Sequence, residues 1–169
     1  MMTSFYDLLE AITEDTKRRI YEKITTVGIS VKRGQKDFLK HPFSSDPGDF
    51  GRGIYYDTNY QRAKTYGNVE ISVIKLKNPI VLTDEEAYNL SDKFRTVRLS
   101  NDDYEKIGKE IGFGPKKRIE RLNAQTQQLL KNAQAMTDFL LSQGYDGLVS
   151  IHKNGLEVVD YRPYQTKTP

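Results

Sequence analysis

The chain has no cysteine, and it has only two histidines among 169 residues, His41 and His152. Without cysteine there can be no disulfide, no thiolate zinc site and no cysteine nucleophile. Two histidines are also too few for a histidine-rich metal site, so we expect the protein to bind no metal. Any chemistry must come from carboxylates, tyrosines, arginines and the backbone.

A strong charge of one sign and a long apolar run are also missing. The chain has 26 Lys and Arg against 23 Asp and Glu, a formal net charge of +3 that does not by itself indicate nucleic-acid binding. No segment approaches the ~20 apolar residues of a membrane span. Acidic residues occupy the place where a signal peptide would have its basic region. We therefore expect a cytoplasmic protein that does not bind a membrane.

The order of hydrophobic patterns predicts an α+β domain. The length fits one domain, residues 1–169, which begins with an amphipathic helix in residues 1–25. Alternating apolar residues and turn signals predict strands, and three- to four-residue periodicity predicts a short helix and a long helical insertion. The strands are expected at 25–33, 53–56, 69–76, 78–82, 148–152 and 156–161, and the helices at 59–66 and 84–143. This order favours α+β over an alternating α/β sheet.

Three short motifs contain the residue types that a nucleotide-using site needs. They are "VKRGQ" at residues 31–35, "FGRGIYYDTNYQRAKTYG" at 50–67 and "LEVVDYRPYQ" at 156–165. An arginine before a glycine offers rigid donors to a pyrophosphate or ribose. A strand carboxylate can stabilise positive charge that develops on a sugar when a glycosidic bond breaks.

In this order the three motifs resemble the ADP-ribosyltransferase superfamily, both its poly(ADP-ribose) polymerase branch and its phage-borne, polyvalent-protein branch. The segments "NPIVL" and "GYDGLV" also resemble the phage-borne members, and the likeness spans roughly residues 27–165. The resemblance implies an ADP-ribosyltransferase-like split β-sheet core with flanking helices. It also implies NAD as co-substrate, and a phage or mobile-element origin with action in the host cytoplasm.

The resemblance assigns roles to particular residues. Glu157 corresponds to the catalytic glutamate, and Arg33 with Gly34 to the motif that holds NAD. Gly53 and Tyr66 correspond to further residues of the NAD site.

Tyr55 corresponds to the aromatic residue that stacks on the nicotinamide. Adjacent strand residues point to opposite faces, so we expect Tyr55 to face the ligand and Tyr56 to enter the core. The glycines would let the backbone approach NAD.

Two departures from the family pattern bear on the reaction. Gly155 stands where many arginine-modifying toxins have a glutamate, so their choice of acceptor does not carry over. Arg33 stands where polymer-forming members have a histidine, which favours transfer of a single ADP-ribose unit. The expected function is mono-ADP-ribosylation of a protein.

Other interpretations stay open. The same fold can form a non-catalytic binding, structural or inhibitory protein, and some relatives modify nucleic acid, which would need a basic acceptor groove. We interpret His41 and His152 as structural, because Arg33 holds the family's histidine position. The basic segment 114–122 could contact nucleic acid, although a solvated helix start is the simpler reading.

Overall fold

The computed structural model describes residues 4–35, 49–95 and 115–165, with a few separate positions between 96 and 114. His41 lies outside the described residues. The helices are α1 (Phe5–Thr26), α2 (Tyr60–Lys64), α3 (Asp84–Asp92) and α5 (Pro115–Ser142), and a 3-10 turn follows at Arg162–Tyr164. The strands are β1 (Ile29–Gln35), β2 (Ile54–Asp57), β3 (Asn68–Ile74), β4 (Pro79–Thr83), β5 (Gly147–His152) and β6 (Gly155–Asp160).

The six strands form one mixed sheet in the order β3-β1-β2-β6-β5-β4. Its neighbouring strands are antiparallel except β4 and β5, which are parallel. The α+β class expected from the sequence is confirmed. β1 and β2 are paired at one position, Lys32 with Asp57, and the strands separate on either side of it.

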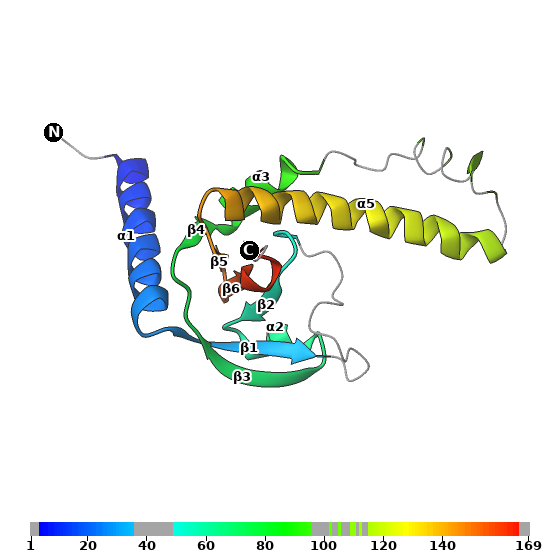
Figure 1. Cartoon of the computed structure of the whole chain (residues 1–169). Helices are drawn as coiled ribbons and strands as arrows, with labels where there is room; N and C mark the ends of the chain where they lie inside the picture. Colours follow the sequence, from blue (N-terminus) through cyan, green and yellow to red (C-terminus); the bar gives the residue numbers. More distant parts are fainter. Residues whose placement is uncertain are drawn as a thin grey trace.

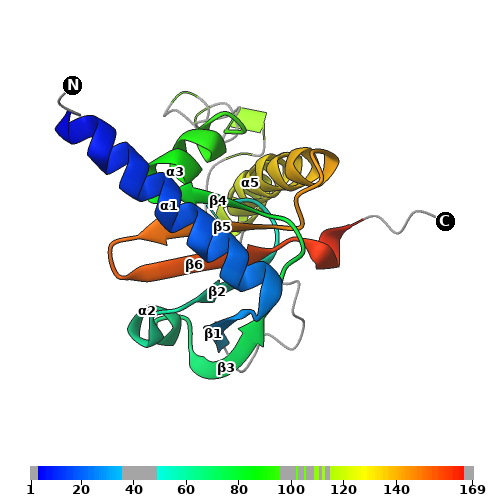
Figure 2. The same cartoon turned by 90° about the vertical axis from the view of Figure 1, so that its left-hand side faces the viewer.

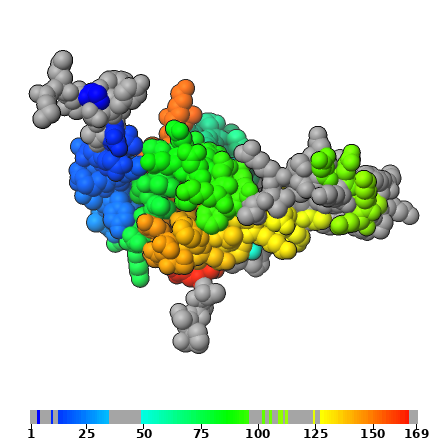
Figure 3. Space-filling view, turned by 90° about the horizontal axis from the view of Figure 1, so that it is seen from above, coloured from blue at the N-terminus to red at the C-terminus, as the bar shows by residue number. Residues whose placement is uncertain are grey.

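Helices cover both faces of the sheet (Figure 1). α1 lies across one face, which we call the α1 face, and Figure 2 shows it crossing the strands. α3 and α5 cover the other face, which we call the α5 face, and Figure 3 shows them next to each other in the view from above. α2 packs against β1, β2 and β3.

Each face has its own apolar core. Leu148 and Val159 project to the α5 face, and their neighbours Val149 and Val158 project to the α1 face, as strand alternation requires. Both cores consist of side chains with little or no exposed surface. On the α1 face these are Ile24, Ile29, Val31, Ile74, Leu76, Val149 and Val158, and on the α5 face Phe50, Ala87, Met136, Leu140, Leu148, Val159 and Tyr161.

The boundaries of the elements have local causes. Asn59 caps α2 by accepting hydrogen bonds from the backbone N–H groups of Gln61 and Arg62. Thr83 and Glu86 form a capping box at the start of α3. The first strand begins at Ile29, later than the expected residue 25, because α1 continues through Thr26 and a turn with Gly28 at φ +88° follows.

Within the range 84–143, the described residues form α3 and α5. Along α5, the side chains of Ala133, Met136 and Leu140 are buried, whereas Leu129 and Phe139 are more than 40% exposed. Among the described residues, no helix has the length and apolar character needed to cross a membrane.

Candidate active site

A row of polar side chains crosses the α5 face where the three motif strands meet. Lys32 on β1 is opposite Asp57 on β2, Asp57 is opposite Glu157 on β6, and Glu157 is opposite Ser150 on β5. Directly opposed residues project to the same face of a sheet. The fold therefore brings one cation, two carboxylates and one hydroxyl together from four strands.

Glu157 is the most perturbed carboxyl group of this row. Its side chain is 20% exposed, and its Oε2 lies 3.2 Å from the Arg62 Nη2. Burial raises the pKa of Glu157 from 4.5 to about 7, against the lowering effect of Arg62 and with the added repulsion of Asp57, Asp49 and Asp84. A carboxyl group with this pKa exchanges its proton near neutral pH.

Arg62, on α2, joins the two carboxylates of the row. Its Nε lies 3.4 Å from Asp57 Oδ2, and its Nη2 donates a hydrogen bond to Glu157. The guanidinium can satisfy two acceptors at once because its donors form a rigid fork. Arg62 thus pairs with both acids, while Asp49 and Asp84 add further negative charge around Glu157.

His152 lies beside Asp57 at the end of β5. Its buried Nε2 is 3.3 Å from Asp57 Oδ2, an ion-pair distance that lacks good hydrogen-bond angles. Its Nδ1 accepts a hydrogen bond from the Asn154 backbone N–H at 3.2 Å. In the neutral ring the proton is therefore on Nε2, the nitrogen that lies 3.3 Å from Asp57 Oδ2.

Two more acids, Asp84 and Asp49, belong to the surroundings of Glu157. Ser150 donates a hydrogen bond to Asp84 Oδ1 at 3.1 Å, and the Tyr88 hydroxyl donates one to Asp49 Oδ2 at 3.3 Å. Burial, followed by the charges of Asp49 and Asp84, raises the pKa of Tyr88 to about 12. Despite these carboxylates, no group of three or more metal-binding side chains with suitable geometry occurs among the described residues.

The first residues of the motif at 50–67, which is rich in glycine and tyrosine, pack inside the protein. The Tyr55 hydroxyl accepts a hydrogen bond from Phe50 N–H at 3.0 Å and donates one to the Gly51 carbonyl at 2.5 Å. The Phe50 carbonyl accepts from Tyr161, and Thr137 on α5 bonds both backbone groups of Arg52. Burial raises the pKa of Tyr55 well above its usual range.

The two glycines assigned to the NAD site are required by protein packing. A Cβ on Gly34 would lie 1.9 Å from the Ala63 carbonyl oxygen on α2. A Cβ on Gly53 would lie 2.5 Å from Val159 Cγ1 on β6. Neighbouring elements therefore occupy the space that these glycines leave free, which gives a structural reason for glycine at both positions.

The tyrosine pair points to opposite faces, as alternation predicts. Tyr55 packs against the α5-face core, and Tyr56 packs against the α1-face core. Both rings are thus partly buried, whereas the sequence assigned only Tyr56 to the core. Stacking of Tyr55 on nicotinamide stays a prediction. Tyr66, 65% exposed, lies with its Cβ close to Gly34.

Arg33 lies on the α1 face, opposite to Glu157. It is opposed to Glu70 on β3 and follows Val31 by two residues, and Val31 belongs to the α1-face core. The structure therefore brings Tyr55, Gly34, Gly53 and Glu157 to the α5 face but does not bring Arg33 there. The cations nearest to Glu157 in its row and ion pairs are Lys32 and Arg62.

Sequence reasoning missed Arg62, Asp57 and the contribution of His152. The face of Arg33 could have been predicted, because Ile29 and Val31 are core residues of the same parity in the strand. Arg62 gave no such signal, since its position next to Glu157 depends on where α2 packs against the sheet. The role of His152 depends in the same way on its contact with Asp57.

Comparisons with known proteins add little to this description. No protein-family model and no curated protein matches the chain. A crystal structure of an anti-CRISPR protein is similar over 81% of this chain and 92% of that chain, with 12% sequence identity and a TM-score of 0.33. A likeness at that TM-score carries no argument about function.

Proposed function

We propose that the protein is an NAD-dependent mono-ADP-ribosyltransferase that modifies a protein acceptor, with Glu157 as its catalytic carboxylate. The motifs single out several residues. Of these, Glu157 has surroundings for which the packing of the fold gives no reason. A buried carboxylate near other acids destabilises the fold unless something compensates it. Retaining it at the centre of a sheet is typical of a functional group. An origin in a phage or mobile element remains an expectation of the resemblance.

The burial and charge of Glu157 support this role. Cleavage of the nicotinamide bond develops positive charge on the ribose, and an adjacent carboxylate would stabilise that charge. The excess negative charge from Asp57, Asp49 and Asp84 would add to the stabilisation. Arg62, held between Glu157 and Asp57, offers its guanidinium to an anionic part of NAD.

The order of the strands also supports the proposal. The three motifs come from segments that are far apart in the sequence, yet their strands β1, β2 and β6 are neighbours in the sheet. Three unrelated surface motifs have no reason to meet in this way. Tyr55 and Glu157 lie on the same face of adjacent strands, so a ring and a carboxylate could both contact one ligand.

The test is transfer of label from NAD to macromolecules of a bacterial lysate. The products are treated separately with protease and with nuclease, so that protein and nucleic-acid acceptors are distinguished. We expect incorporation that protease removes and nuclease does not. Incorporation removed only by nuclease would establish the nucleic-acid-modifying alternative instead.

The Glu157→Gln variant tests the residue. It preserves size and hydrogen bonding but removes the charge, so we expect turnover to fall by roughly a hundredfold or more. Glu70→Gln is the matched control, because Glu70 is an exposed strand carboxylate on the edge strand β3. Equal turnover of wild type and Glu157→Gln would remove Glu157 from the mechanism.

The pH dependence gives an independent measurement. Glu157 must be ionised to stabilise a cation, and its pKa is raised to about 7. We therefore expect kcat/KM for NAD to rise from pH 6 to pH 8 and then to level off. A flat profile over this range would contradict a catalytic carboxylate with this pKa.

A second candidate is a non-catalytic binding protein of the same fold. It is favoured by the packing reasons for Gly34 and Gly53, by the internal hydrogen bonds of the Tyr55 hydroxyl and by the position of Arg33 on the α1 face. Folded wild-type protein that neither binds NAD in calorimetry nor consumes it would establish this candidate.

A further inference from the structure

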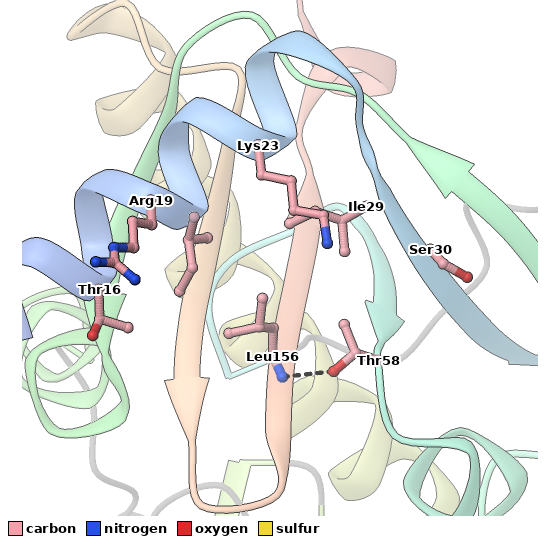
Figure 4. A pocket seen from close by; sticks show the side chains of 8 residues that line it. Thr16, Arg19, Lys23, Ile29, Ser30, Thr58 and Leu156 are labelled. Atoms are coloured by element: carbon pink, nitrogen blue, oxygen red, sulfur yellow. Dashed lines mark hydrogen bonds between the residues drawn. The ribbon is translucent and has the colours of Figure 1, made fainter.

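A pocket lies on the α1 face, between α1 and the ends of three strands (Figure 4). Its lining residues come from α1, from the first two residues of β1, from Thr58 just after β2 and from Leu156 near the start of β6. Its volume is about 550 Å³, within the range of about 300–1,000 Å³ that small-molecule sites occupy. The pocket is therefore large enough for more than a single inorganic ion.

Two cations stand along its helical wall. Arg19 and Lys23 are one turn apart on α1, so both side chains project from the same side of the helix. Lys23 extends from α1 into the space above the strands in Figure 4. Arg19 also pairs with Asp15, Nε to Oδ2 at 2.8 Å, whereas the Lys23 ammonium has no ion pair among the described residues.

The rest of the wall combines hydroxyl groups with an apolar floor. Thr16, Ser30 and Thr58 supply the hydroxyls, and Thr58 Oγ1 already accepts a hydrogen bond from Leu156 N–H at 2.8 Å. Ile20, Ile29 and Leu156 supply the apolar surface. Of the residues that the structure describes, no Asp or Glu lines the pocket, so its two cations face no described carboxylate inside it.

We propose that this pocket binds a small phosphate ester with an apolar group. A phosphate has enough acceptor oxygens to use two cations and neighbouring hydroxyls, whereas a carboxylate has only two oxygens. The apolar floor gives the remaining volume to the ester group. Lys23 also lies in the last turn of α1, where a cation interacts favourably with the helix dipole. Arg19 is not in the last turn, so the helix dipole does not explain its charge.

This site is separate from the proposed active site. Leu156 projects to the α1 face, whereas its neighbour Glu157 projects to the α5 face. None of Arg33, Tyr55 and Glu157 lines the pocket. The inference therefore stands or fails independently of ADP-ribosyl transfer.

The experiment is an NMR titration of the full chain with phenyl phosphate, and with inorganic phosphate and phenol as separate probes. We expect saturable shifts of the backbone amides of Ser30, Thr58 and Leu156 with phenyl phosphate. Binding of the two partial probes should be weaker, because each contacts only part of the pocket. Absence of shifts at these amides, or equal binding of either partial probe, would overturn the proposal.

The variant Lys23→Gln tests the cation, and Lys131→Gln on α5 is the matched control. Both lysines are exposed, so the variants should fold, which the same spectra verify. Loss of one charge-assisted contact should weaken phenyl phosphate binding by roughly tenfold or more in Lys23→Gln and leave it unchanged in Lys131→Gln. Equal affinity in Lys23→Gln and wild type would contradict the inference.

Discussion

The two faces of the sheet use the same strands for different purposes. On the α1 face, the central strands β6 and β5 present Val158 and Val149, both fully buried. On the α5 face, the adjacent residues of the same strands are Glu157 and Ser150, which belong to the polar row. One step along a strand thus separates an apolar core from a cluster of acids.

This difference shows that one face of the sheet serves mainly the stability of the fold, whereas the other also holds the groups that could take part in a reaction. The α1 face buries aliphatic side chains against one helix, and the pocket beside them has the polar residues Lys23 and Ser30 in its wall. The α5 face has a second apolar core, but the core stops at the row that contains Asp57 and Glu157. Buried acids reduce the stability of a fold. The acids of the α5 face therefore lower stability at the place where we propose that the reaction occurs.

The largest expected effect compares the two tyrosines. Tyr55→Ala removes a packed ring and two hydrogen bonds to the Phe50–Gly51 backbone, so we expect a loss of about 3–5 kcal/mol in the free energy of unfolding. Tyr56→Ala removes a half-buried ring and should cost about 1–2 kcal/mol. Urea denaturation of both variants measures the difference. A larger loss in Tyr56→Ala would mean that the α1 face depends more on its tyrosine.

The second prediction concerns the stability cost of Glu157 itself. Its pKa in the folded state, about 7, lies above the ordinary 4.5, so the folded state binds more protons between these values. The contribution of Glu157 to the free energy of unfolding should therefore be fully present below pH 4.5 and be lost as the pH rises through 7. The glutamine of Glu157→Gln does not titrate. The free energy of unfolding of this variant should therefore rise relative to that of the wild type by up to roughly 3 kcal/mol across this window.

Denaturant midpoints of wild type and Glu157→Gln at pH 4, 5.5 and 8 measure this effect. Val158→Ala serves as the comparison from the other face, because its cost should not depend on pH. A constant difference between Glu157→Gln and wild type at all three pH values would show that Glu157 titrates normally.

A third, smaller effect is expected at Gly34. The Cβ of Gly34→Ala would collide with the Ala63 backbone oxygen, so α2 must move away from β1. We expect a loss of about 1–3 kcal/mol, together with a change at the Arg62–Glu157 ion pair because Arg62 is on the same helix. Thermal melts measure the stability, and the pH profile of turnover reports the ion pair.

The smallest effect is expected from Arg33→Ala. Arg33 lies at a strand end on the α1 face, so its removal should change stability by no more than about 0.5 kcal/mol and leave NAD affinity close to wild type. Arg62→Ala should weaken NAD binding and shift the pH profile upward, because Arg62 lowers the pKa of Glu157. Calorimetry with NAD on both variants decides between them. Loss of affinity in Arg33→Ala alone would restore the role that the sequence assigned to it.

The amino-acid sequence was sufficient for the elements and the fold class. Periodicity located α1, and alternation located strands close to their observed positions, because both patterns record which side chains face a core. The strands expected at 148–152 and 156–161 are the antiparallel pair β5 and β6. Helix capping is also local, since the Asn59 side chain accepts hydrogen bonds from backbone groups two and three positions away.

The tertiary structure alone decided which residues surround Glu157. Its neighbours Arg62, Asp57 and Asp84 come from α2, β2 and α3, and their approach depends on how these elements pack on the sheet. The same packing supplied the reasons for glycine at 34 and 53, which the sequence had attributed to a ligand. Sequence alone determined which chemical groups the protein has and the face to which each strand residue points. Charges and steric contacts between distant segments act only after folding brings them together, so the environment of the carboxylate was decided by the fold.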